Sequence, residues 1–151
     1  MKALFKLSLF ITTIALSSCT SESVVTSTSS QLTNSTTQEY AYSDVIDKTI
    51  FWDEVFSIDE NFYYVYFYSK TCSHCAELKN FIIGKALERN DIYFVQSSNV
   101  VRYTQDEQSV LGIDSIEKLM IVGYPSLLKI EFGKVCKNLV GGAQIKKELT
   151  L

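Results

Sequence analysis

The sequence predicts an α/β domain in which a central mixed β-sheet is flanked by helices. Three observations predict this fold class. An unbroken run of strand-forming residues occupies 62–68, apolar residues at helical spacing follow over 72–90, and two further apolar runs flank Gly133-Lys134. Continuous apolarity is typical of a buried central strand, whereas the last two runs indicate an antiparallel hairpin.

The composition fits one globular domain and excludes one class of partner. The chain has 151 residues, of which 46% are hydrophobic and 21% are charged, and its formal net charge is -3. That length allows a single core. Binding of nucleic acid needs a basic footprint, so no nucleic-acid partner is expected.

Residues 1–18 have the anatomy of a lipoprotein signal peptide. A short lysine-containing start precedes the apolar run 7–16, which is too short to span a bilayer. The run leads into Leu16-Ser17-Ser18-Cys19, which resembles the lipobox of bacterial lipoproteins, where cleavage precedes a cysteine that carries the lipid. Cys19 is therefore the predicted lipidation site, and the protein is expected to be extracytoplasmic and anchored to the cell membrane. An ordinary signal peptide with an incidental cysteine, or an uncleaved anchor, is the alternative.

Residues 19–39 are predicted to form a flexible tether. Ser and Thr dominate this stretch, which could not bury enough apolar surface to offset the entropy of ordering it. From Tyr40 onward the composition becomes aromatic and aliphatic. The folded domain is therefore expected to cover 40–151.

The first half of the domain is expected to contain two helices and two strands. Apolar spacing indicates a short helix over 51–58, and the run 62–68 is the expected central strand, covered on both faces. A longer helix over 72–90 and a second buried strand over 92–95 follow. The residues of the longer helix expected to face inward are Leu78, Phe81, Ile82 and Leu87.

The second half is expected to contain a short helix, a hairpin and a closing helix. The capping-box spacing at the start of 114–119 indicates a helix there. The runs 126–132 and 135–140 are expected to pair antiparallel around Gly133-Lys134. Residues 143–149 can form the closing helix, and the helices are expected to cover both faces of the sheet.

The main candidate site is Cys72-Ser73-His74-Cys75, because a strand that ends in a turn delivers C-x-x-C to the start of a helix. The positive end of the helix favours a thiolate, so Cys72 is the expected attacking nucleophile. Cys75 is placed to resolve the mixed disulfide that Cys72 forms with a client. Both are predicted to be catalytic.

Ser73 and His74 are the expected redox-tuning residues. His74 is the single histidine of the chain, and an imidazole beside the Cys72 sulfur can stabilise a thiolate. Stabilising the reduced form makes the disulfide a stronger oxidant. The alternative for His74 is a solvated turn residue.

The alternatives for the cysteine pair are a structural disulfide and a zinc site. Zinc needs four ligands in a closed site, and only Cys136 and His74 are further candidates, so no metal is expected. A disulfide that closes so short a loop constrains little of the unfolded chain. No cofactor is expected. For Cys136 itself, a small buried hydrophobe is favoured over a third redox or mixed-disulfide thiol.

The segments YVYFYSKTCSHC (64–75), VGYPSL (122–127) and FGKV (132–135) together resemble the thioredoxin superfamily. The match covers roughly 45–149 and implies a thioredoxin-like fold. It also implies that Pro125 is cis and faces the cysteines, while Tyr124 offers backbone hydrogen bonds to a client peptide. A trans proline at the start of a strand is the alternative.

Departures from the thioredoxin pattern are also informative. Thr71 replaces the usual Trp, Ser73-His74 replaces Gly-Pro, and Tyr66 stands where a buried Asp is common. The chain therefore looks closer to extracytoplasmic thiol oxidoreductases than to the cytosolic reductant. No proton-handling carboxylate is expected at residue 66.

The predicted function is that of an extracytoplasmic thiol-disulfide oxidoreductase. Its expected clients are protein thiols or disulfides, and an unidentified redox partner would restore the cysteine pair. The direction of electron flow stays open. The alternative is a non-catalytic surface binding module or an accessory lipoprotein with a structural disulfide.

Overall fold

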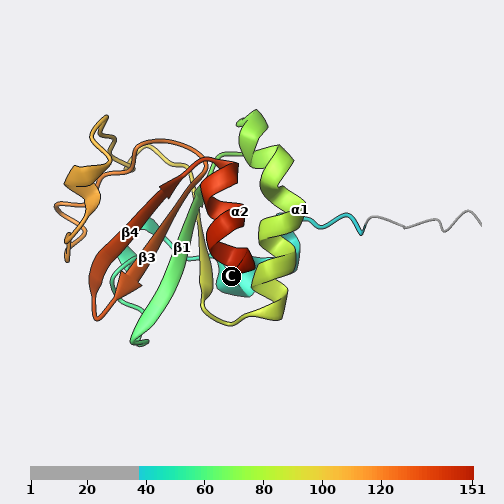
Figure 1. Cartoon of the computed structure of the whole chain (residues 1–151), viewed down its shortest axis with the longest axis horizontal. Coiled ribbons are helices and arrows are strands. Elements are labelled where there is room, and N and C mark those ends of the chain that lie inside the picture. The colour runs from blue at the N-terminus through green and yellow to red at the C-terminus, as the bar shows by residue number, and fades with distance from the viewer. Residues whose placement is uncertain (1–37) are drawn as a thin grey trace, which may run out of the picture. The chain divides into compact units, whose positions relative to one another are not determined.

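The computed structural model describes residues 38–151 and contains a four-stranded β-sheet in the order β2-β1-β3-β4 (Figure 1). The predicted signal peptide, Cys19 and most of the predicted tether lie outside the described residues. The strands are β1 (Phe62–Tyr68), β2 (Ile92–Gln96), β3 (Ser126–Glu131) and β4 (Lys134–Val140). Strand β1 pairs parallel with β2 and antiparallel with β3, which pairs antiparallel with β4. The predicted mixed sheet is confirmed.

Strand β1 is the central element, buried on both faces. Tyr64, Tyr66 and Tyr68 belong to the core on one face, whereas Tyr63, Val65 and Phe67 belong to the core on the other. Side chains of a strand alternate between faces, so a strand with no polar position can only be covered on both. The sequence-based prediction for 62–68 is therefore confirmed.

Both α-helices, α1 (Ser73–Glu88) and α2 (Gly142–Thr150), pack on the face that carries Tyr66 (Figure 1). The 3-10 helix η1 (Tyr42–Lys48) joins them there through Val45. The inward stripe of α1 differs in part from the prediction, because Leu87 is 50% exposed. Residues four apart share a helix face, and the stripe that is buried comprises Cys75, Leu78, Ile82, Ile83 and Ala86.

The opposite face of the sheet is covered by 3-10 helices and irregular chain, not by α-helices. The expected helix over 51–58 is reduced to η2 (Trp52–Glu54), and the segment between β2 and β3 contains only η3 (Gln108–Val110). The helix predicted over 114–119 is wrong, because this stretch makes a single turn. Leu119 at its end and Ile121 beyond it are fully buried against the sheet, and so short a helix gains too few hydrogen bonds to offset its nucleation.

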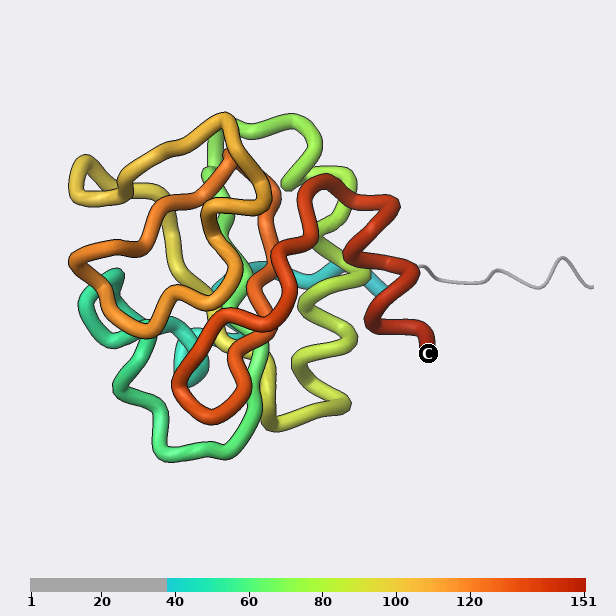
Figure 2. The backbone as a smooth tube through the Cα atoms, turned by 60° about the vertical axis from the view of Figure 1, so that its left-hand side comes forward, coloured from blue at the N-terminus to red at the C-terminus, as the bar shows by residue number. Residues whose placement is uncertain are grey.

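Together, these elements confirm the thioredoxin-like α/β fold: a mixed sheet flanked by helices, with the predicted C-x-x-C at the start of the helix that follows β1. The smooth backbone trace in Figure 2 shows α1 and α2 side by side, with the 97–122 segment on the other side of the sheet. The fold therefore leaves the end of β1 and the start of α1 at one end of the sheet.

The hairpin between β3 and β4 turns one residue earlier than predicted. Glu131 pairs with Lys134, so the two-residue loop is Phe132-Gly133, and Lys134 already belongs to β4. Both loop residues have positive φ, 47° for Phe132 and 72° for Gly133. Such a turn matches the twist of the flanking strands, but a bulky side chain at positive φ is strained.

Replacing Phe132 with Asn should stabilise the protein. Asn tolerates positive φ and Asn-Gly is the preferred pair for this turn, while the Phe132 side chain is 83% exposed and contributes little packing. We expect Phe132→Asn to raise the free energy of unfolding by about 1 kcal/mol in urea titrations. Phe132→Val, whose β-branched side chain fits this backbone poorly, should lower it, and a destabilised Asn variant would contradict the turn assignment.

Candidate active site

Cys72 lies at the N-terminal end of α1, immediately after the turn that leaves β1. Its backbone N–H donates to the carbonyl oxygen of Ser69 at 3.2 Å, and its own carbonyl accepts from the N–H of Ala76 at 3.1 Å. The Cys72 sulfur accepts a hydrogen bond from the backbone N–H of Cys75 at 3.3 Å. A cap hydrogen bond and the positive end of a helix both stabilise negative charge on this sulfur.

Cys75 differs from Cys72 in its burial. Its side chain is 1% exposed, inside the core between α1 and the sheet, whereas Cys72 is half-buried. Burial, followed by the hydrogen bond with Cys72, raises the pKa of the Cys75 thiol to about 12. Cys75 therefore keeps its proton at neutral pH. The two sulfurs combine an accessible nucleophile with a protected thiol one turn further along the helix.

The Tyr124-Pro125 peptide bond faces this cysteine pair. It is cis, as the resemblance implied, and the Cys72 thiol donates to the carbonyl oxygen of Tyr124 at 3.5 Å. Ser126 holds the same loop from the other side, because its hydroxyl donates to the carbonyl oxygen of Gly123 at 2.8 Å. The predicted client-binding residues Tyr124 and Pro125 thus lie beside Cys72.

Tyr103 also belongs to this site, although no sequence pattern indicates it. Its hydroxyl donates to the Tyr124 hydroxyl at 2.8 Å, and the two rings meet edge to face at 5.9 Å between centroids. Tyr103 is 54% exposed, so the pair forms an aromatic rim next to Cys72. This contact spans 21 positions of the chain and comes from a segment without periodicity, so no local signal could have revealed it.

The side chains of Ser73 and His74 are exposed to solvent. The imidazole Nδ1 of His74 lies 3.6 Å from a carboxylate oxygen of Glu77, and the His74 side chain is 74% exposed. The hydrogen-bond partners of the Cys72 sulfur are the Cys75 amide and the Tyr124 carbonyl. Redox tuning by Ser73 and His74 therefore remains a prediction.

Cys136 is not brought to the active site, and the expectation that it is buried is wrong. It is exposed on the edge strand β4, directly after the buried Val135, so the alternation of the strand turns its side chain outward. Its neighbour Lys137 pairs with Lys129, which in turn pairs with Tyr64. The active-site turn follows the opposite end of β1, so Cys136 is remote from Cys72.

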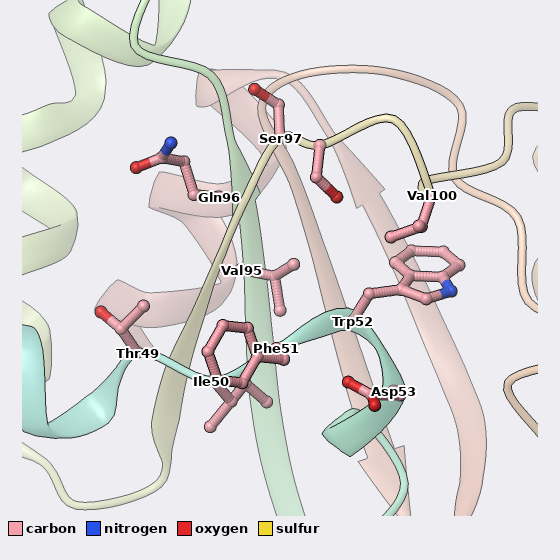
Figure 3. A pocket seen from close by; sticks show the side chains of 10 residues that line it. Thr49, Ile50, Phe51, Trp52, Asp53, Val95, Gln96, Ser97 and Val100 are labelled. Carbon is pink, nitrogen blue, oxygen red and sulfur yellow. The ribbon is translucent and has the colours of Figure 1, made fainter.

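No group of three or more His, Cys, Asp or Glu side chains within 38–151 is arranged to hold a metal ion. In the same part of the chain, no helix is long and apolar enough to cross a membrane. A cavity of about 650 Å³ lies beside β2, where Phe51, Trp52, Val95 and Val100 line it (Figure 3). It contains none of the predicted site residues.

Comparison with known proteins gives distant structural likenesses only. No protein-family model matches the chain, and no curated protein matches it. Spinach chloroplast thioredoxin f is 17% identical, with a TM-score of 0.46 over 68% of this chain and 80% of that one. Plasmodium falciparum thioredoxin is 13% identical, with a TM-score of 0.45 over 68% of this chain and 96% of that one. Mitochondrial thioredoxin 3 from Saccharomyces cerevisiae is 9% identical, with a TM-score of 0.44 over 68% of this chain and 92% of that one. At these levels the likenesses carry no argument about activity, which must rest on the site itself.

Proposed function

We propose that this protein is a thiol-disulfide oxidoreductase that acts on protein clients outside the cytoplasm. The observation that carries the proposal is the asymmetric cysteine pair: the Cys72 sulfur sits at the positive end of α1, and Cys75 is buried one turn later. The loop that carries cis Pro125 lies against the same sulfur. A structural disulfide would not require this difference in exposure.

The geometry supports a two-step exchange. As a thiolate, Cys72 attacks one sulfur of a client disulfide, so that a Cys72–client disulfide forms and the other client sulfur leaves as a thiolate. Cys75 then gives its proton to the departed thiolate and attacks the Cys72 sulfur, which releases the second client sulfur as a thiolate. The client is reduced by two electrons and the Cys72–Cys75 pair is oxidised.

The same steps in reverse oxidise a client dithiol. Which direction dominates depends on the unidentified redox partner that restores the pair, and on the relative stability of its dithiol and disulfide forms. The exposed positions of Ser73 and His74 allow contact with a client or partner, and through such contact they would tune this balance.

Client binding is assigned to the loop around Pro125. The carbonyl oxygen of Tyr124, in the peptide bond to Pro125, lies 3.5 Å from the Cys72 sulfur, and the Tyr103–Tyr124 aromatic pair extends that surface. Rigid tyrosine side chains provide contact area at low entropic cost, so this rim suits an extended peptide segment next to the reacting sulfur. The same rim also suits a second function, a binding module in which the disulfide is only structural.

The activity is tested by removing the nucleophile. We expect Cys72→Ala to reduce insulin reduction and peptide oxidation to the rate measured without protein, because no other half-exposed thiol lies at a helix N-terminus among the described residues. Cys136→Ala is the matched control, a thiol remote from the site, and should keep full activity. Equal rates for wild type and Cys72→Ala would favour the binding module.

The location is proposed from the lipobox-like sequence before Cys19. Replacing the lipid-bearing residue should remove the anchor, so Cys19→Ala should move the protein from the membrane fraction to the soluble fraction. Ser18→Ala, which keeps a small residue next to the cleavage position, should leave the distribution unchanged. A Cys19→Ala protein that still partitions with membranes would rule out lipidation at this residue.

A further inference from the structure

Two buried tyrosine hydroxyls near Cys75 have no hydrogen-bond partner among the described residues. They belong to Tyr66, whose side chain is fully buried, and to Tyr42 of η1. A buried hydroxyl without a partner loses its hydration and gains nothing in return, so it destabilises the fold. Such a group in a native structure requires an explanation.

Other tyrosines of β1 show that this is not a general property of the strand. The Tyr63 hydroxyl donates to the carbonyl oxygen of Val55 at 2.9 Å. The Tyr64 hydroxyl donates to the Glu148 carboxylate at 3.0 Å. Tyr66 therefore differs from its two satisfied neighbours, one of which lies on the same face of the strand.

The unpartnered hydroxyls lie in the layer that also contains the Cys75 sulfur. Tyr66 projects from β1 toward α1, and Cys75 projects from α1 into the same core cluster. The ring of Tyr42 stacks on that of Tyr68 with centroids 3.9 Å apart, and the Tyr68 ring is stacked at 6.0 Å from that of Tyr66. This aromatic stack holds both rings at the core cluster that contains Cys75.

We propose that the Tyr66 hydroxyl donates a hydrogen bond to the Cys75 thiolate when that thiolate forms, and that the Tyr42 hydroxyl assists it. This inference rests on the proposed function, because the thiolate exists only during exchange. A thiolate in a buried, water-poor layer needs a donor to replace hydration. The Tyr66 hydroxyl, which has no hydrogen-bond partner in the resting protein, then donates to the Cys75 thiolate in the step that forms this thiolate.

Titration behaviour agrees with this geometry. Burial raises the pKa of Tyr66 far above its ordinary value, and Tyr42 and Cys75 add to the effect. The phenol therefore keeps its proton and acts as a donor, never as the base. For Cys75 the effect of Tyr66 is opposite to that of burial, since the Tyr66 hydroxyl lowers the pKa of the thiol.

Four titratable groups interact with Cys75, each from a different part of the chain. They are Cys72 at the start of α1, Tyr66 on β1, Tyr42 on η1 and Tyr124 before β3, and all are thiols or phenols. In the mixed disulfide Cys72 carries no charge, so its contribution to the raised pKa of Cys75 disappears. The proton of Cys75 leaves to the client thiolate released in the first step, as a new bond forms between the Cys75 and Cys72 sulfurs.

The test uses Ellman's reagent in place of a client. In the full chain with Cys19→Ser and Cys136→Ser, Cys72 and Cys75 are the only thiols. Cys72 attacks the reagent and releases a first coloured thiolate at a rate that depends on reagent concentration. Cys75 then attacks the Cys72 sulfur and releases a second in a concentration-independent phase. This second phase reports the Cys75 thiolate directly, without any protein client.

We expect Tyr66→Phe to slow the second phase about tenfold at neutral pH, because one hydrogen bond to a charged group is lost. The bend in its pH profile should move upward by about one unit while the alkaline plateau is kept. A purely structural disturbance would lower the plateau instead. The first phase should be unchanged, and the melting temperature should be equal to or above that of the parent, because the hydroxyl has no partner in the resting protein.

Tyr64→Phe is the matched control, on the same strand and face but remote from Cys75, and should leave both phases unchanged. A Tyr66→Phe variant with the parent's second phase and pH profile would overturn the proposal, as would a lowered plateau without a shifted bend. Failure of the proposed function has a different signature: normal release of both thiolates without activity on insulin.

Discussion

Burial of β1 on both faces is the constraint on which the rest of this structure depends. Apolar and aromatic side chains at every position from Tyr63 to Tyr68 are buried, which forces the strand between β2 and β3 and requires a covering layer on each side. The chain leaves β1 at the end of the sheet, through the turn before α1. Cys72 therefore emerges at a surface, while Cys75, one turn later, is drawn into the layer between α1 and the sheet.

This placement gives the two sulfurs different electrostatic surroundings. Cys72 receives a backbone hydrogen bond at the positive end of a helix, whereas burial holds the proton on Cys75. Two-step exchange requires an accessible nucleophile and a second thiol that keeps its proton until the first step is complete. The aromatic face of β1 that buries Cys75 also brings the Tyr66 hydroxyl into its layer, so the core and the proposed chemistry share the same side chains.

Local patterns in the sequence predicted the features that depend on local forces. The unbroken run of β1, the C-x-x-C at the start of α1 and the hairpin were foreseen because each depends on residues close in sequence. The rim tyrosine Tyr103 was missed because only tertiary packing of an irregular segment brings it to Tyr124. Cys136 was misjudged because its exposure depends on the register of an edge strand. The helix expected over 114–119 fails because burial of Leu119 and Ile121 outweighs its weak helical signal.

The central claim is that the Cys72–Cys75 pair is redox-active and not a structural disulfide. The most direct test is its reduction potential, measured by equilibration with glutathione in the full chain carrying Cys19→Ser and Cys136→Ser. An active pair should fall between about -270 and -120 mV, the range that known thiol-disulfide exchange proteins span, and the value within that range would show which direction of transfer is favoured. A potential below about -300 mV, typical of structural disulfides in secreted proteins, would contradict the account.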